Sequence, residues 1–330
     1  MVDPYARRVK DLRISITDRC NFRCTYCMPA EGMQWLPKTE LLTYEEIGRV
    51  ARVCVERFGF EAIRLTGGEP LVRAHITRLI GQLAPLGADL ALTTNGVKLG
   101  EAAHDLREAG LRRVNVSLDS LRRERFFALT RRDELDRVLA GIDAALDAGL
   151  DPVKVNAVVM RGVNDDEVVD LARFGRDKGI GVRFIEFMPL DAQDAWSRDQ
   201  VVPAAEILDR IDAVFPLARA EDHGAEPATR FEYRDGVGDV GVIPSVTEPF
   251  CDSCDRVRLT AEGQFRTCLF ALEEFDLRAE LRAGAGLDEP DLDARLAAAI
   301  QGAVGTKWAG HHIGAADFVR PDRSMSQIGG

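Results

Sequence analysis

The stretch LRISITDRCNFRCTYC, residues 12–27, decides the fold, because a short β-type run leads directly into a loop that carries three cysteines. Five further β-rich runs follow along the chain, with helical patterns between them. The six runs span residues 12–16, 62–66, 89–93, 113–118, 153–160 and 182–187. Strands that are joined by helical crossovers run parallel, and right-handed connections wind them into a barrel or an open sheet.

Six strand–helix units are too few for a complete eight-unit barrel. We therefore predict an α/β fold, an incomplete (β/α)6 barrel of the TIM type, with its chemistry at the C-terminal ends of the strands. The first helix is readable in detail, because Thr43 and Glu46 form a capping box and apolar residues recur at helical spacing up to Phe58. Cys54 lies on this apolar stripe, which favours a small buried hydrophobe over a ligand.

The pattern changes after residue 217, where a polar, charged segment with Gly224 and Pro227 is typical of a loop or linker. Two hairpins and two helices are predicted beyond it. The hairpin strands span residues 231–234 with 240–243 and 256–260 with 264–268, and the helices span 275–283 and 292–304. We predict two parts, a partial barrel in residues 1–217 and a region in residues 218–330 that covers its open side.

Composition excludes some functions. The formal net charge of −11 argues against a general nucleic-acid binder, because binding to the phosphate backbone relies on basic surface. No stretch approaches eighteen consecutive apolar residues, and residues 1–8 lack the apolar segment of a secretory signal. We therefore expect a cytoplasmic protein with no nucleic-acid or membrane partner.

Six of the seven cysteines form two groups, Cys20, Cys24 and Cys27 near one end and Cys251, Cys254 and Cys268 near the other. Clustered thiols in a long chain without an export signal indicate metal or redox chemistry rather than a disulfide framework. Thiolates favour zinc or iron–sulfur centres, and structural zinc normally has a fourth protein ligand. Three cysteines on a four-iron cluster instead leave one iron open for a substrate or cofactor.

The spacing C-x3-C-x2-C, with Tyr26 before the last cysteine, resembles the signature of the radical S-adenosylmethionine enzymes. The resemblance implies that Cys20, Cys24 and Cys27 hold a [4Fe–4S] cluster whose open iron binds S-adenosylmethionine. An electron from the cluster then releases a 5′-deoxyadenosyl radical. Four further residues match positions at which that family contacts S-adenosylmethionine, namely Tyr26, Gly68 in the turn after the second strand, Ser117 and Met188.

The second cysteine group has the spacing C-x2-C-x13-C, again without an obvious fourth ligand. A structural zinc site completed by His311 or His312 is the alternative. Alternation along a strand places Arg256 and Arg258 on one face. Arginine forks match phosphate oxygens, so a triphosphate would suit a site that joins them with Arg13, Arg64 and Lys154 from predicted core strands.

The resemblance extends to the GTP 3′,8-cyclase family of molybdenum-cofactor biosynthesis over residues 18–29, 64–71, 184–189, the second cysteine group and the tail 325–330. It implies that GTP loses its ribose 3′ hydrogen and closes a C3′–C8 bond to give 3′,8-cyclo-7,8-dihydro-GTP. It also implies a second [4Fe–4S] cluster on Cys251, Cys254 and Cys268, and a tail that assists the reaction through Gly329 and Gly330. The GTP contacts that it implies are Arg13, Arg64, Thr93, Lys154, Arg256, Val257 and Arg258.

The same resemblance implies several partners: a flavodoxin- or ferredoxin-like electron donor, a cyclic pyranopterin monophosphate synthase that receives the product, and a second copy of the chain in a homodimer. Two rival functions stay open on the sequence. One is a radical S-adenosylmethionine enzyme that modifies a peptide with the help of an auxiliary cluster, and the other is a zinc-containing binding protein without catalysis. Simple electron transfer is disfavoured, because two fully ligated clusters need eight cysteines and the chain has seven.

Overall fold

The computed structural model describes the chain except residues 192–194, 222–225, 285, 287, 316 and 330. Its described strands form one sheet in the order β12-β11-β10-β1-β2-β3-β4-β5-β6-β9-β8-β7. The six central strands are parallel neighbours in chain order and lie within one residue of the predicted runs. Their bounds are β1 Asp11–Ser15, β2 Ala62–Thr66, β3 Asp89–Thr94, β4 Arg113–Ser117, β5 Val153–Val159 and β6 Gly181–Glu186.

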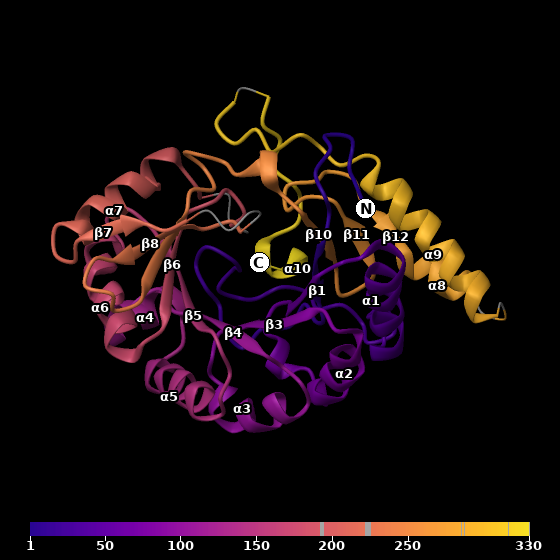
Figure 1. Ribbon diagram of the computed structural model, residues 1–330, viewed down its shortest axis with the longest axis horizontal. Helices are drawn as coiled ribbons and strands as arrows, with labels where there is room; N and C mark the ends of the chain where they lie inside the picture. Colours follow the sequence, from indigo (N-terminus) through magenta and orange to yellow (C-terminus); the bar gives the residue numbers. More distant parts are fainter. Residues whose placement is uncertain (192–194, 222–225, 285, 287, 316, 330) are drawn as a thin grey trace.

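The crossover helices lie outside the sheet, which curves around a central space (Figure 1). Their bounds are α1 Tyr44–Phe58, α2 Ile76–Leu83, α3 Leu99–Glu108, α4 Arg123–Thr130, α5 Leu135–Asp147, α6 Val168–Lys178 and α7 Ala204–Asp212. The buried core lies between these helices and the outer face of the strands, and it includes Leu12, Ile63 and Val114. The predicted α/β fold with a parallel sheet is therefore confirmed.

Helix α1 begins as the sequence predicts. The Thr43 hydroxyl accepts a hydrogen bond from the Glu46 amide, and the Glu46 carboxylate accepts one from the Thr43 amide. These two bonds satisfy backbone donors that the first turn cannot pair internally. Cys54 is fully buried on the core face of the helix, so its expected place as a small hydrophobe is confirmed.

Both predicted hairpins form, and one strand of each also continues the parallel sheet. In one, β8 (Thr229–Tyr233) pairs antiparallel with β9 (Asp239–Ile243), and β9 runs parallel to β6. In the other, β10 (Arg256–Leu259) pairs antiparallel with β11 (Gln264–Arg266), and β10 runs parallel to β1. The C-terminal region therefore adds strands to the sheet on both sides of the six central strands.

Two short strands end the sheet, β7 (Leu217–Arg219) beside β8 and β12 (Phe275–Asp276) beside β11. Because strands from both sides of residue 217 share this one sheet, the division there stays a prediction. The remaining 3-10 helices are η1 Pro70–Val72, η2 Ala84–Leu86, η3 Asp165–Glu167, η4 Arg198–Gln200 and η5 Cys251–Ser253.

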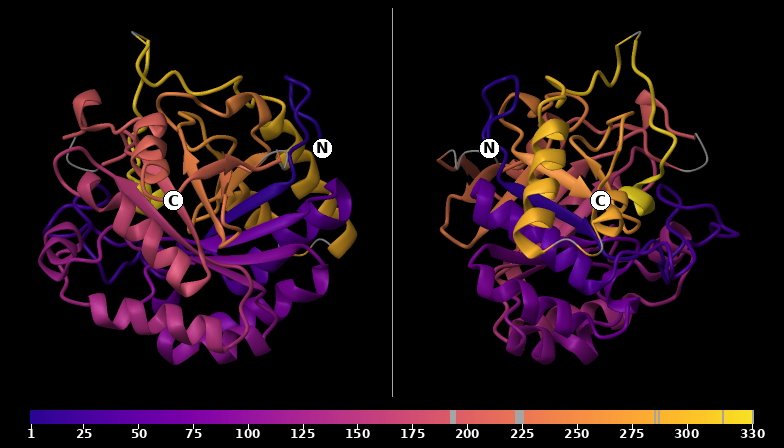
Figure 2. Two further views of the ribbon diagram at one scale, coloured as in Figure 1. Left: turned by 60° about the vertical axis from the view of Figure 1, so that its left-hand side comes forward. Right: turned by 90° about the vertical axis from the view of Figure 1, so that its right-hand side faces the viewer.

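Helices α8 (Leu277–Ala283) and α9 (Glu289–Val304) pack together on one side of the sheet, and α9 contacts α1. Figure 2 shows α9 on the same side of the molecule as α1. The last helix, α10 (Met325–Ile328), returns to the centre of the molecule (Figure 1). None of the described helices is both long and apolar enough to cross a lipid bilayer.

Candidate active site

A cavity of about 620 Å³ occupies the inside of the curved sheet. Alternate residues of each strand line it, because successive side chains of a strand point to opposite faces. On β4, for example, Arg113, Asn115 and Ser117 face the cavity, while Val114 and Val116 are buried in the core. The cavity therefore runs along the strands, from their N-terminal ends to the loops that follow them.

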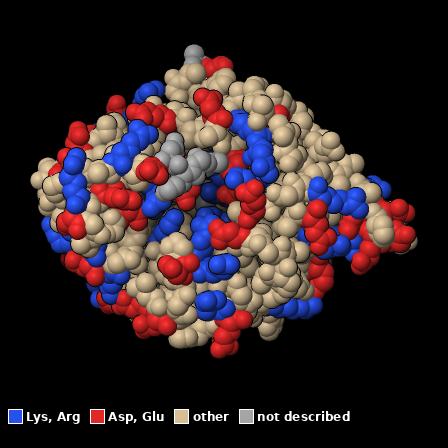
Figure 3. Space-filling model, viewed as in Figure 1, with Lys and Arg blue, Asp and Glu red and all other residues tan. Residues whose placement is uncertain are grey.

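Cationic side chains gather inside this cavity. Arg258 on β10, Arg13 on β1 and Arg64 on β2 occupy one row of the sheet, because Arg13 is the register partner of both others. Adjacent strands lie about 4.8 Å apart, so three like charges are close neighbours. Figure 3 shows lysine and arginine side chains around the central hollow. The row favours an anionic ligand, since like charges held together repel one another.

Six of the seven predicted GTP contacts line the cavity. Its lining includes Arg13, Arg64, Thr93, Lys154, Arg256 and Arg258. Val257 does not line it, because its side chain points to the other face of β10 and is fully buried in the core. Its expected role in GTP binding stays a prediction for which the side chain offers no contact.

Several guanidinium nitrogens in the cavity wall are buried without a hydrogen-bond partner among the described residues. They are Nε of Arg13, Nε and Nη1 of Arg64, and Nε and Nη2 of Arg256. Burial, reinforced by the nearby Arg13 charge, lowers the pKa of Arg64 to about 9. Unpaired buried donors are costly unless a ligand satisfies them. These positions therefore fit the oxygens of a phosphate group.

Two other arginines in the cavity wall, which the sequence did not single out, are already paired. Arg113 forms an ion pair with Asp89, and Arg183 donates to the Asp239 carboxylate at 2.5 Å. Their inward position follows from strand alternation, so the period-two pattern was the signal that could have found them. Their ion pairs leave less of their charge for a ligand.

The first cysteine group occupies the loop that follows β1, and all three thiols are free and line the cavity. The Phe22 amide donates to Sγ of Cys20 at 3.3 Å. Burial raises the pKa of Cys20 to about 12 and that of Cys27 to about 11. Since buried thiols ionise when a metal binds them, this donor set fits an iron–sulfur cluster.

The turn after β2 lies against this loop. The Gly68 amide donates to the Thr17 carbonyl, and a Cβ atom at Gly68 would lie only 2.4 Å from the Arg19 carbonyl oxygen. Glycine is required here because the two backbones approach closely. Together with Ser117 and Met188, Gly68 lines the cavity beside the cysteines, so the expected S-adenosylmethionine contacts lie near one another.

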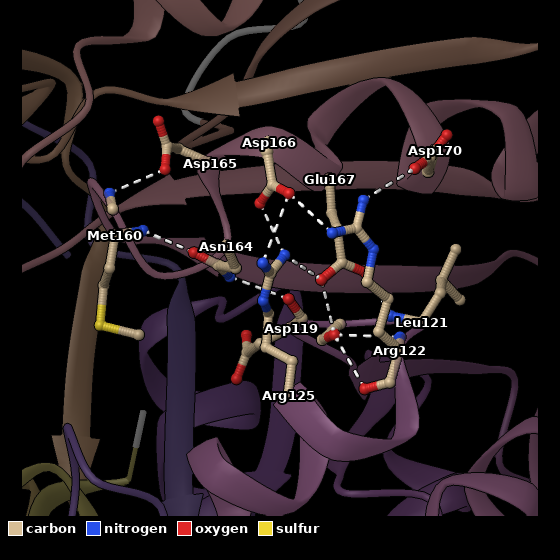
Figure 4. Close-up of polar contacts among 12 residues, drawn as sticks. Asp119, Leu121, Arg122, Arg125, Met160, Asn164, Asp165, Asp166, Glu167 and Asp170 are labelled. Carbon is tan, nitrogen blue, oxygen red and sulfur yellow. Dashed lines mark hydrogen bonds and ion pairs between the residues drawn. The ribbon is translucent and has the colours of Figure 1, made fainter.

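Tyr26 is anchored by a buried carboxylate, because its hydroxyl donates to Asp119 at 2.6 Å. Burial raises the pKa of Asp119 to about 6. Figure 4 shows how the loop that carries Asp119 is fixed: Asn164 donates to the Asp119 backbone carbonyl at 2.8 Å. The fully buried Glu167 accepts hydrogen bonds from Ser120 and Arg125 in the same network. Asp119 was not predicted, and no pattern in the sequence marked it.

The thiols of the second cysteine group, Cys251, Cys254 and Cys268, are free and do not line the cavity. Their sequence neighbours Phe250 and Arg256 do line it, and the Arg256 guanidinium lies 4.5 Å from the centre of the Phe250 ring. Among the described residues, no three Cys, His, Asp or Glu side chains are arranged to hold a single metal ion.

The two histidines that could complete a zinc site, His311 and His312, lie in different surroundings. His311 packs on Phe270, with ring centres 4.9 Å apart, and it lies next to Gly310, at which a Cβ atom would come within 2.9 Å of Sγ of Cys251. His312 instead pairs with Asp317 at the surface. Only His311 is therefore close to the second cysteine group.

The C-terminal tail enters the cavity between the two cysteine groups. Ser326 hydrogen-bonds to the Cys27 thiol, and the Arg258 guanidinium donates to the Gly329 carbonyl. Gly329 has a positive φ of 71°, and a Cβ atom there would lie 2.4 Å from Oγ of Ser15. The structure therefore places Gly329 against Arg258 and Ser15 on the inner face of the sheet, while Gly330 lies outside the described residues.

Comparisons with known proteins agree with this arrangement. The family model described as the Radical SAM superfamily matches residues 14–175, and the model described as Molybdenum Cofactor Synthesis C matches residues 180–313. The GTP 3′,8-cyclase of Paenarthrobacter nicotinovorans is 50% identical over 351 residues, covering 100% of this chain and 97% of the relative. The GTP 3′,8-cyclase of Streptomyces coelicolor is 50% identical over 334 residues, with coverages of 100% and 96%.

The matching solved structures are less similar in sequence than these two relatives. SuiB of Streptococcus suis, bound to its precursor peptide SuiA, superposes with a TM-score of 0.59 at 13% identity, covering 80% of this chain and 60% of that one. The same protein bound to S-adenosylmethionine gives a TM-score of 0.58 at 14% identity, with coverages of 86% and 66%. Likeness at this identity shows a shared fold and says nothing about the substrate.

Proposed function

Because this chain belongs to the GTP 3′,8-cyclase family of radical S-adenosylmethionine enzymes, we propose that its cavity binds GTP between two iron–sulfur clusters. The family acts in the first step of molybdenum-cofactor biosynthesis. The full-length identity of 50% to two such cyclases favours this function over the peptide-modifying rival, because the 13% identity to SuiB shows only a shared fold.

Cys20, Cys24 and Cys27 would hold the first cluster. With S-adenosylmethionine bound, that cluster supplies a 5′-deoxyadenosyl radical. The residues around it bind and orient: the Gly68 turn, Ser117 and Met188 would contact S-adenosylmethionine, and Asp119 fixes the Tyr26 ring beside the cysteines. Enclosure matters, because a reactive radical attacks whatever lies nearest and only an oriented substrate gives one product.

The triphosphate would lie against the row formed by Arg258, Arg13 and Arg64, with Lys154 and Thr93 nearby in the cavity wall. This row is the observation that carries the proposed substrate. Its unpartnered guanidinium nitrogens need acceptors, and arginine forks pair with phosphate oxygens in bidentate fashion. The purine would then point toward Arg256 and the second cysteine group.

Cys251, Cys254 and Cys268 would hold the second cluster, with one iron left for the substrate. In the proposed reaction GTP loses its ribose 3′ hydrogen, C3′ bonds to C8 of guanine, and one electron and one proton complete 3′,8-cyclo-7,8-dihydro-GTP. The tail that carries Gly329 and Gly330 would close the space between the clusters. We also propose a flavodoxin- or ferredoxin-like electron donor and a downstream cyclic pyranopterin monophosphate synthase that receives the product. The chain would act as a homodimer in the cytoplasm.

Isotope labelling tests the reaction. The anaerobically reconstituted chain is incubated with S-adenosylmethionine, a reductant and GTP that carries deuterium at the ribose 3′ position. Mass spectrometry then measures the masses of 5′-deoxyadenosine and of the nucleotide product. We expect deuterium in 5′-deoxyadenosine and a cyclised nucleotide. GTP labelled at the ribose 4′ position is the control and should transfer none. Unlabelled deoxyadenosine beside unchanged GTP would refute the proposed substrate.

Iron counting tests the two clusters separately. Serine replaces all three cysteines of one group at a time, and iron and sulfide are measured after anaerobic reconstitution. We expect each triple variant to keep about half the iron of the parent chain, because each group would hold one four-iron cluster. Iron that is unchanged in the variant lacking Cys251, Cys254 and Cys268 would contradict the second cluster.

A further inference from the structure

A buried lysine lies beside the second cysteine group. Lys307 follows the end of α9, and its side chain is almost fully enclosed, with 3% of the residue exposed. Its ammonium group donates to the Arg256 carbonyl at 2.9 Å and to the Thr267 carbonyl, and it lies 3.9 Å from Sγ of Cys254. Lys307 does not line the cavity, so the proposed contacts to S-adenosylmethionine and GTP leave it without a role.

The three contacts join both arms of the cysteine group. Arg256 stands two residues after Cys254 on β10, and Thr267 directly precedes Cys268 after β11. One ammonium group therefore connects the two chain segments that must converge if Cys254 and Cys268 bind the same cluster. Residues behind the ligands often orient a metal centre in this way.

The charge of Lys307 has no acidic partner among the described residues. Its hydrogen-bonding partners there are two carbonyls and a thiol. An ammonium group is rarely buried without a compensating negative charge. Carbonyl dipoles satisfy its donors but leave its charge unbalanced. The remaining candidate is the negative charge of a metal–thiolate group on the cysteines beside it.

The other cations near this cysteine group have partners or face the cavity. Arg266 is paired with Glu274, and Arg258 donates to the Gly329 carbonyl. Arg7 is paired with the buried Asp3 and donates to the backbone carbonyls of Cys251, Trp308 and Ala309. Arg256 faces the cavity, where the proposed substrate lies. Lys307 is therefore the cation that lies behind the cysteine group, away from the cavity, with its ammonium group against the Cys254 thiol.

Charges of both signs lie beside the second cysteine group, because Asp255 is buried directly after Cys254 and the Lys307 ammonium group contacts the Cys254 thiol. A nearby positive charge favours adding an electron to a cluster, whereas a nearby negative charge disfavours it. Removing the charge of Lys307 alone should therefore make a cluster at this site harder to reduce.

We propose that Lys307 is a positioning residue of the second metal centre, where its ammonium group joins the two cysteine arms and makes the cluster easier to reduce. This inference rests on the proposed function, which places a [4Fe–4S] cluster on Cys251, Cys254 and Cys268. A cluster with three thiolates becomes more negative when it accepts one electron from the external donor. The fixed cation stabilises that reduced state.

The test measures a potential on the full chain. Serine replaces Cys20, Cys24 and Cys27, so that only the second centre remains, and its midpoint potential is determined by an anaerobic titration followed by electron paramagnetic resonance. In this background Lys307→Gln removes the charge, Lys307→Arg keeps it, and Lys178→Gln, an exposed lysine on α6 paired with Asp143, is the matched control.

We expect Lys307→Gln to reduce the equilibrium constant for one-electron reduction of the cluster by at least tenfold. This change corresponds to a midpoint potential that is lower by about 59 mV. Lys307→Arg and Lys178→Gln should leave it near the parent value. Iron that is lost in Lys307→Gln and restored in Lys307→Arg also supports the inference, because the cation would then be what holds the two arms together.

Three results would overturn the inference. The first is a Lys307→Gln variant with the parent's iron content and potential, and the second is a loss of iron that is equal in the Gln and Arg variants, since the position would then matter only for packing. The third is a parent background without any iron. That result removes the proposed second cluster as well, and so it is distinguishable from the other two.

Discussion

Individual side chains in the cavity wall account for the proposed preference for an anionic substrate. Arg64 is the clearest case, because its Nε and Nη1 atoms are buried without a partner among the described residues. In the same cavity Arg113 has its charge balanced by Asp89. Both arginines line the cavity, Arg64 from β2 and Arg113 from β4. Arg64 has unpaired donors that a ligand can satisfy, whereas the charge of Arg113 is already balanced.

Arg64→Gln should weaken GTP binding by roughly tenfold to a hundredfold, because hydrogen bonds to charged groups contribute about 1.5–3 kcal/mol. Calorimetry with GTP in the absence of reductant measures the loss. Arg113→Gln is the control and should cost less, since its charge is already paired. The unfolding temperature of Arg64→Gln should not fall, because the variant removes buried donors that lack partners. A GTP affinity equal to that of the parent would contradict the proposed phosphate site.

Lys154 predicts a pH dependence of binding. Burial, together with the nearby Arg183 charge, lowers the pKa of Lys154 to about 8. As the pH rises through that value the ammonium group loses its proton and its attraction for phosphate. The dissociation constant of GTP should therefore increase between about pH 7 and pH 9.

Lys154→Arg should flatten this dependence, since a guanidinium keeps its proton throughout that range. Binding of guanosine, which has no phosphates, is the control and should follow neither trend. A GTP dissociation constant that stays constant in the parent chain from pH 7 to pH 9 would remove Lys154 from the phosphate site.

At the level of elements, short segments outside the strands line the candidate active site. Helix α10 has only four residues, yet it places the tail between the two cysteine groups through Ser326 and Gly329. The turn after β2 approaches the cysteine loop just as closely through Gly68. Both contacts depend on glycine, because a side chain at either position would overlap its neighbours.

Gly329→Ala should displace the tail. Its Cβ atom would lie 2.4 Å from Oγ of Ser15 and 2.7 Å from Cγ2 of Thr66, and its positive φ of 71° is strained for alanine. GTP conversion should fall by roughly a hundredfold, as expected for a misplaced catalytic segment, while the iron content is retained. Hydrogen exchange of residues 325–328 should become faster.

Gly302→Ala is the matched control for this change, because Gly302 lies within α9 and a Cβ atom added there would meet no neighbouring side chain within 4 Å. It should leave conversion and exchange of the tail unchanged. Parent-like conversion by Gly329→Ala would show that the position of the tail is not required for the reaction.

The whole molecule is built on one continuous sheet. Strands β9 and β10, both from the predicted second region, lie parallel to β6 and β1 on the two sides of the six central strands. The proposed GTP site therefore combines arginines from residues far apart in sequence. Separating the two regions would expose the edges of β1 and β6 and divide the site.

We therefore expect the metal-free chain to unfold in urea as one cooperative unit. Single-tryptophan variants that retain either Trp35 or Trp308 report on the two regions, and their fluorescence midpoints should coincide. Circular dichroism provides the control for secondary structure. Separate midpoints for the two tryptophans would instead support two independent domains that divide near residue 217.

The sequence by itself determined the six central strands, the first helix with its capping box, the two hairpins and both cysteine groups. These features are local: strand alternation, capping and ligand spacing are written in neighbouring residues. The sequence also identified the arginines that face the cavity, apart from Arg113 and Arg183. It did not separate Val257, whose side chain faces the core, from the residues that line the cavity.

Only the tertiary structure decided how β9 and β10 extend the parallel sheet, which guanidinium nitrogens lack a hydrogen-bond partner among the described residues, and where Gly329 lies. The reason is that pairing between strands, burial and charge balance depend on residues that are distant in the chain. Arg258, Arg13 and Arg64 become neighbours through the register of three strands, and Lys307 meets Cys254 only after α9 has packed against the sheet.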